Sequence, residues 1–164
     1  MTMITVNIKD QEVLAVLGRL YGGLKDMRPA MENIAQALTT ESERQFASQS
    51  GPLGGWPALS KETTIPFRTE KGSWPGMMLQ VTAGGLAGSV QTSFGYNFAR
   101  IGSNKPYSAM QFFGGITSPT SMIPGKTIPA RPYLPFNPRT TELSAPAKVT
   151  VLEILEGYFD RLTS

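Results

Sequence analysis

The segment from Ile128 to Leu134, Ile-Pro-Ala-Arg-Pro-Tyr-Leu, places the strongest constraint on how this chain can fold. Each of its two prolines fixes its own φ at about −65° and disfavours helical geometry in the residue before it. The backbone is therefore stiff and extended before any tertiary contact forms. We expect this segment to make an anchoring or docking contact through the following residues: Ile128, Pro129, Arg131, Pro132, Tyr133 and Leu134.

Arg131 is the charged residue of this segment, and two interpretations of it stay open. Its place between two prolines favours a contact with another subunit, in which case Arg131→Ala weakens assembly more than it weakens folding of the monomer. The alternative is an intramolecular salt bridge, or a hydrogen bond to the carbonyl ends of a helix.

The composition limits the chemistry that the chain can perform. The 164 residues include no cysteine and no histidine. Disulfides, thiolate nucleophiles, thiolate metal sites and imidazole bases are therefore excluded. A length of 164 residues predicts one domain, residues 1–164, able to bury a core without covalent staples. We expect no enzymatic activity, no catalytic residue, no cofactor and no metal.

The N-terminus lacks a basic start followed by an apolar core, and no run approaches the roughly 20 apolar residues that span a membrane. We therefore expect no membrane partner, and assembly in the cytoplasm.

Charge is unevenly distributed along the chain. Residues 76–147 hold five Lys or Arg and one Asp or Glu, whereas residues 1–75 hold eight of each. Such an excess attracts anionic partners. Arg100, Lys105 and Lys126 are candidates for a surface that faces DNA, although a loop-rich region that is short of acids by chance explains the numbers equally well.

Three stretches carry helical periodicity. Apolar residues recur every three or four positions in 11–21, and Gly22-Gly23 predicts the end of that helix. A second helix is expected over 29–49, with an apolar stripe that fades within 39–43. Two interpretations of this weak middle stay open: the helix lines a contact between subunits, or it covers a sheet and leaves one turn exposed to solvent. The third helix, from about 147 to 162, has the strongest pattern.

The remaining segments predict strands and turns. Residues 3–8 alternate as a short strand, 86–92 and 94–101 as antiparallel strands, and 77–82 as a strand or a helix end, with a turn at 83–85. The fold class is therefore α+β: N-terminal helices and a C-terminal helix packed on a small, mainly antiparallel β-sheet, with a long loop.

Both tryptophans lie in an irregular stretch rich in glycine and proline, residues 50–76. Trp56 and Trp74 each neighbour a proline, and large aromatic residues in loops typically plug the edge of a core. Carbohydrate stacking, as in a module directed at peptidoglycan, is the alternative. Two shorter helical segments are expected, within 58–65 and over 107–113.

A loop of thirteen residues precedes the segment 128–134. Loops of this length are uncommon inside compact domains and are often functional. Met122, Ile123 and Lys126 are expected near its tip, so this loop is predicted to contact something outside the monomer.

Four phrases in fixed order resemble the phage virion morphogenesis family, the tail-completion or neck proteins of Mu-like contractile-tailed phages. They are Trp56-Pro57-Ala58-Leu59-Ser60 with Thr63; Leu79 to Val90 with Ser89; Ile101-Gly102-Ser103-Asn104 with Tyr107, Gln111, Phe112 and Gly114; and Ile128 to Leu134 before a final helix. Three positions depart from the family pattern: the turn Thr82–Leu86 is one residue longer, Pro135 replaces a glycine, and Met110 replaces a histidine.

The resemblance implies a structural protein of the virion that forms a homo-oligomeric ring at the head-tail junction or tail end. It favours a ring of six copies, with twelve as the alternative. The implied partners are the tail tube, the terminator and the head-completion proteins, with non-specific contact to packaged DNA. Two alternatives stay open: a capsid-assembly accessory that is not retained in the virion, and a non-specific DNA-binding module.

Overall fold

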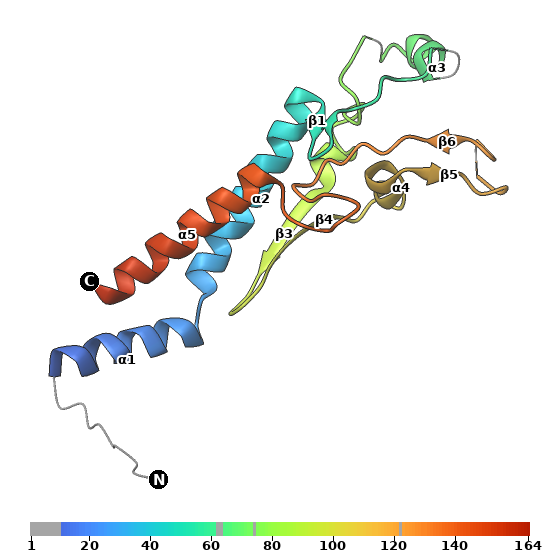
Figure 1. Ribbon diagram of the computed structural model, residues 1–164. Helices are drawn as coiled ribbons and strands as arrows, with labels where there is room; N and C mark the ends of the chain where they lie inside the picture. The colour runs from blue at the N-terminus through green and yellow to red at the C-terminus, as the bar shows by residue number, and fades with distance from the viewer. Residues whose placement is uncertain (1–10, 62–63, 74, 122) are drawn as a thin grey trace.

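The computed structural model describes residues 11–61, 64–73, 75–121 and 123–164 (Figure 1). The strand predicted for residues 3–8 lies outside the described residues, as do Trp74 and Met122. The chain folds as α+β, as predicted. Its helices are α1 (Gln11–Lys25), α2 (Arg28–Ser48), α3 (Thr64–Glu70), α4 (Ser108–Phe113) and α5 (Ala145–Thr163), with a 3-10 turn η1 (Ala87–Ser89).

The strands form three separate antiparallel pairs instead of one sheet. They are β1 (Ser50–Gly51) with β2 (Gly54–Gly55), β3 (Val90–Phe94) with β4 (Ala99–Ser103), and β5 (Gly115–Ile116) with β6 (Thr127–Ile128). The β3–β4 ribbon is the longest pair, in register from Val90 opposite Ser103 to Phe94 opposite Ala99. Since Gly95 donates its N–H to the carbonyl of Phe98, the turn begins where a strand was expected to continue.

Helix α2 is the centre of the fold. It contacts α5 on one side and the β3–β4 ribbon on another, while α1 packs against α5 below this pair (Figure 1). The stripe that fades in the sequence continues in the structure through buried polar residues, Ser42 and Gln45. The weak middle of α2 therefore faces the interior of this molecule.

Helix α1 does not end at Gly22-Gly23, so that prediction is wrong. A Cβ at Gly23 would lie 2.2 Å from a methyl group of Leu162, which means that the glycine allows α5 to approach closely. Tyr158 donates its hydroxyl hydrogen to the carbonyls of Gly23 and Asp26, each at 3.0 Å. These contacts stabilise the last turn of α1, so tertiary packing overrides the local signal to stop.

The strand or helix end predicted for 77–82 is also wrong. Gln49 accepts a hydrogen bond from the N–H of Met78 at 3.0 Å, and Gln80 donates to the carbonyl of Phe46 at 2.9 Å. This segment therefore caps the C-terminal end of α2, and Leu79 takes a positive φ of 62° that a strand does not contain. The turn predicted at 83–85 is present, with the N–H of Gly85 donating to Thr82.

The long loop is more regular than the sequence suggests. Its two ends pair as β5 and β6, and beyond them Thr117 donates its N–H to the carbonyl of Lys126 at 2.9 Å. The hydroxyl of Thr117 also bonds to the carbonyl of Ile123 and accepts from the N–H of Lys126. The loop is therefore a hairpin that projects from the body of the molecule (Figure 1).

Five buried residues form the main core: Phe46, Trp56, Leu86, Phe112 and Tyr133. Phe46 meets Trp56 edge to face at 5.7 Å between ring centroids, so the prediction that Trp56 plugs the core is confirmed. A second cluster of Ile34, Leu38 and Ala147 joins α2 to α5.

Candidate functional site

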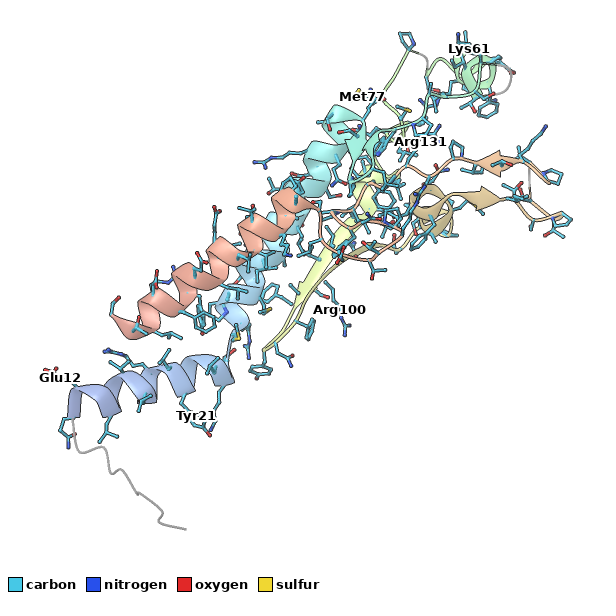
Figure 2. The ribbon with its side chains drawn as sticks, viewed as in Figure 1. Glu12, Tyr21, Lys61, Met77, Arg100 and Arg131 are labelled. Carbon is cyan, nitrogen blue, oxygen red and sulfur yellow. The ribbon has the colours of Figure 1, made fainter. Side chains whose placement is uncertain are left out.

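The segment 128–134, hereafter the anchor segment, crosses the interior of the molecule. Its residues Arg131, Pro132 and Tyr133 are buried. Tyr133 packs against Phe46 of α2 and Phe112 of α4, and Arg131, labelled in Figure 2, contacts the chain that leads to α3. Because prolines hold the backbone extended, its polar groups cannot bond to each other as they do in a helix. They must therefore find partners elsewhere in the chain.

Three hydrogen bonds join the backbone of the anchor segment to three other parts of the fold. They are Arg131 N–H to the carbonyl of Gln111 at 2.7 Å, Trp56 Nε1 to the carbonyl of Pro132 at 2.9 Å, and Ser42 Oγ to the carbonyl of Tyr133 at 2.6 Å. Since buried backbone groups without partners are costly, these bonds fix the path of the segment.

The Arg131 side chain forms its hydrogen bonds within its own chain. Only 6% of the residue is exposed, its Nε donates to the carbonyl of Pro57 and its Nη2 to that of Ala58, both at 3.0 Å. These partners are loop carbonyls instead of a helix end or a carboxylate. The geometry favours the intramolecular interpretation of Arg131, and a role in assembly stays a prediction.

A second buried arginine, Arg68 of α3, lies near Arg131. It is 7% exposed, and its Nη1 donates to the carbonyl of Met77 at 3.2 Å. Both arginines line a cleft of about 500 Å³, together with Gln111 and Lys126, which we call the arginine cleft. No local sequence pattern identifies Arg68 as buried, because its position depends on the contact between α3 and the carbonyl of Met77.

The electrostatics of the arginine cleft are unfavourable for its two guanidinium groups. Burial lowers the pKa of Arg131, and the positive charge of Arg68 lowers it further. Burial also lowers the pKa of Arg68. Among the described residues, neither arginine forms an ion pair with a carboxylate. The cleft therefore holds cationic donors that an anion would stabilise.

The three residues predicted near the tip of the loop do not share one environment. Ile123 is 52% exposed on the hairpin, and its contact with a partner stays a prediction. Lys126 is exposed and lines the arginine cleft. Met122 lies outside the described residues.

The three cations proposed to face DNA lie on three different segments. Arg100 is exposed on β4, where its guanidinium carbon lies 4.6 Å from the centroid of Phe98 (Figure 2). Lys105 is half-buried in the turn before α4, and Lys126 lies beside β6. Contact of these residues with DNA stays a prediction.

Helix α1 presents an apolar surface that the sequence analysis did not separate from the core. Four large apolar residues with spacings of three, four and three are each at least 44% exposed: Leu14, Leu17, Tyr21 and Leu24, hereafter the α1 seam. The opposite side of α1 packs on α5. Spacing of this kind is typical of a helix that packs against another partner, and it could have been recognised as a second stripe.

A concave apolar surface lies elsewhere on the molecule. It is a groove of about 400 Å³ between β4, α4 and the chain after the anchor segment, hereafter the α4 groove, lined by Ile101, Phe112, Phe113, Leu134 and Phe136 among others. Phe113 is 58% exposed at its edge. The α1 seam and the α4 groove share no residue.

Among the described residues, a metal-binding cluster and a membrane-spanning helix are both absent. No group of three or more Asp, Glu, His or Cys side chains is placed to hold a metal ion. In the same part of the chain, no helix combines the length and the apolar character needed to cross a membrane.

The chain belongs to the phage virion morphogenesis family, which it matches over residues 8–159. It is 36% identical over 103 residues to the "Putative capsid assembly protein G" of Escherichia phage Mu, a match that spans 62% of this chain and 64% of the Mu protein. It is 27% identical over 161 residues to the "Mu-like prophage FluMu G protein 2" of Haemophilus influenzae, covering 98% and 99% of the two chains. No solved structure matches it significantly.

Proposed function

We propose that this chain is a structural subunit that assembles into a closed ring at the tail end or neck of a phage particle, completing the tail and joining it to the filled head. A hexamer is favoured over a dodecamer. Membership of the virion morphogenesis family supports a structural role in particle assembly. The observation that carries the self-association is the exposed α1 seam.

A ring with one kind of contact needs two different complementary surfaces on each subunit. The α1 seam is convex and the α4 groove is concave, and both are apolar. We propose that the seam of one copy enters the groove of the next copy. Burial of Leu17, Tyr21 and Leu24 would contribute about 1.5 to 3 kcal/mol for each fully covered side chain, before the entropic cost of association.

The β5–β6 hairpin and its exposed Ile123 are proposed to contact the neighbouring layer of the particle, the tail tube and its terminator on one side or the head-completion proteins on the other. Arg100, Lys105 and Lys126 are proposed to face the channel through which DNA passes. Their contact would be electrostatic and non-specific.

The test is particle assembly with a disrupted seam. Leu17→Ser with Tyr21→Ser in the phage that encodes this chain is expected to yield filled heads and separate tails by electron microscopy. Ala15→Ser, on the same helix and outside the seam, serves as the matched control and is expected to yield joined particles. Joined particles from the seam variant would contradict the proposal.

A second candidate function is a capsid-assembly accessory that leaves the mature particle, and the name of the phage Mu relative favours it. The two functions differ in whether the chain is retained. Mass spectrometry of purified complete virions is expected to detect the chain in ring stoichiometry. Its absence from those particles, together with malformed heads in the seam variant, would support the accessory role instead.

A further inference from the structure

The arginine cleft has the properties of an anion site that the fold has already built. Arg131 and Arg68 are 6% and 7% exposed, and both are held in place by hydrogen bonds to backbone carbonyls. These bonds engage Nε and Nη2 of Arg131 and Nη1 of Arg68. Two cations that are fixed and partly desolvated favour a shared anion.

The lining of the cleft selects a carboxylate on an aliphatic stem. Ile123, Ile128 and Pro129 provide apolar walls beside the guanidinium groups, and the cleft is about 500 Å³. A planar guanidinium binds a carboxylate through two parallel hydrogen bonds. The side-chain amide of Gln111 also lines the cleft, and its Oε1 is buried without a partner in the described structure, so rotation of this amide would supply a further N–H donor.

A complementary acidic surface is present on α5. Glu153, Glu156 and Asp160 have spacings of three and four, which places them on one face of the helix, and all three are exposed. The ion pairs of the described residues join Arg28 to Asp26 and Arg44 to Glu41, and neither involves this acidic stripe.

The acidic stripe and the arginine cleft lie at different ends of the molecule, as a head-to-tail contact requires. The C-terminal half of α5 lies beside α1, while the arginine cleft adjoins the β5–β6 hairpin at the far end of the molecule (Figure 1). One subunit therefore cannot bring its own stripe to its own cleft, whereas a neighbouring copy can. Opposite charges at separate ends fix the orientation and the register of such a contact.

We propose that the arginine cleft of one copy binds a carboxylate from the α5 acidic stripe of the next copy, Glu153 or Glu156, between Arg68 and Arg131. This inference rests on the proposed ring and adds a specific polar contact to it. Lys126 at the rim of the cleft would attract the stripe during encounter, since exposed charges act mainly on association.

The first test is isotope-resolved cross-linking of the full chain. Equal amounts of ¹⁴N- and ¹⁵N-labelled protein are mixed, treated with a carbodiimide that couples lysine amines to nearby carboxylates, and digested for mass spectrometry. The expected product joins Lys126 of one label to Glu153 or Glu156 of the other. Coupling of Lys126 only to carboxylates of its own copy would show that the chain fills its own cleft and would overturn the proposal.

The second test is charge reversal. The hairpin bonds of Lys126 use its backbone, so Lys126→Glu leaves them intact. Lys126→Glu is expected to weaken association about tenfold, and so is Glu153→Lys with Glu156→Lys. Adding Lys126→Glu to that pair is not expected to restore association, because Arg68 and Arg131 still repel the introduced lysines. Arg139→Glu and Glu43→Lys, both at exposed positions, are the matched controls. An oligomer of normal mass that is indifferent to all these changes would overturn the carboxylate contact and leave the ring intact, whereas a chain that is monomeric throughout would contradict the ring itself.

Discussion

The indole Nε1 of Trp56 donates a hydrogen bond to the carbonyl oxygen of Pro132 across 2.9 Å, although the two residues are 76 positions apart. The same carbonyl lies against Gly51, where an added Cβ would be 2.2 Å from the oxygen. The anchor segment is therefore held by the β1–β2 turn and by the residue that follows it. This contact joins the irregular region after α2 to the stiff segment before α5.

Gly51→Ala is expected to lower the free energy of unfolding by more than about 2 kcal/mol, because backbone must move to relieve the clash with Pro132. Gly55→Ala is the matched control, since a Cβ there meets nothing within 4 Å. Urea unfolding followed by tryptophan fluorescence measures both. Equal stabilities of the two variants would show that the turn does not depend on this close approach.

Arg131→Ala is expected to destabilise the monomer by about 2 to 4 kcal/mol, because it leaves the carbonyls of Pro57 and Ala58 without their donor. Arg131→Lys keeps the charge but cannot reproduce the planar pair of donors, so an intermediate loss is expected. Thermal unfolding of monomer at low concentration is the measurement. Unchanged melting with impaired assembly would mean that Arg131 acts only between copies and does not stabilise the monomer.

Tyr133 makes stability depend on pH at the alkaline end. Burial raises the pKa of its hydroxyl above 10.0, against a smaller lowering by its hydrogen bond to Ser108. The folded chain therefore keeps this proton more tightly than the unfolded chain. The contribution is complete below pH 10 and is lost as the pH rises through the folded pKa. Unfolding free energies at pH 8 and pH 11 are expected to differ more for the natural chain than for Tyr133→Phe, and parallel changes would contradict this assignment.

Substitutions in the α1 seam are expected to affect assembly without affecting folding. Leu17→Ser with Tyr21→Ser is expected to leave the melting temperature of the monomer within a few degrees of its original value, since these side chains are 47% and 64% exposed. The same variant is expected to lose at least tenfold in self-association, because each side chain is covered only in the oligomer. Sedimentation velocity compares it with Ala15→Ser. A large loss of melting temperature would mean that the seam belongs to the core of the monomer.

Helices were predicted well from the sequence wherever the local signal and the tertiary packing favour the same structure. The helix expected over 29–49 is α2, the one expected over 107–113 is α4, and the one expected over 147–162 is α5. Ser144 caps α5 by accepting a hydrogen bond from the N–H of Ala147 at 3.4 Å. The end of α1 and the segment 77–82 were predicted wrongly. Both depend on distant partners, Leu162 for the former and Gln49 for the latter.

The candidate site was predictable only in part. The prolines around Arg131 show that its backbone is extended, and they identify the anchor segment without any tertiary information. The arginine cleft is formed by residues from α3, α4 and β6, which no local pattern brings together. Ser42 is a similar case, because a buried serine in a helix breaks the apolar stripe while bonding to the backbone of Tyr133.

Native mass spectrometry of the purified full chain, over a hundredfold range of concentration, decides whether the protein builds a ring. The proposed ring predicts one closed assembly of defined mass, with six copies favoured, in equilibrium with monomer and shifted to monomer by the seam variant. A chain that stays monomeric at every concentration, or a continuous ladder of sizes without a closed species, would contradict the claim that this protein builds a ring.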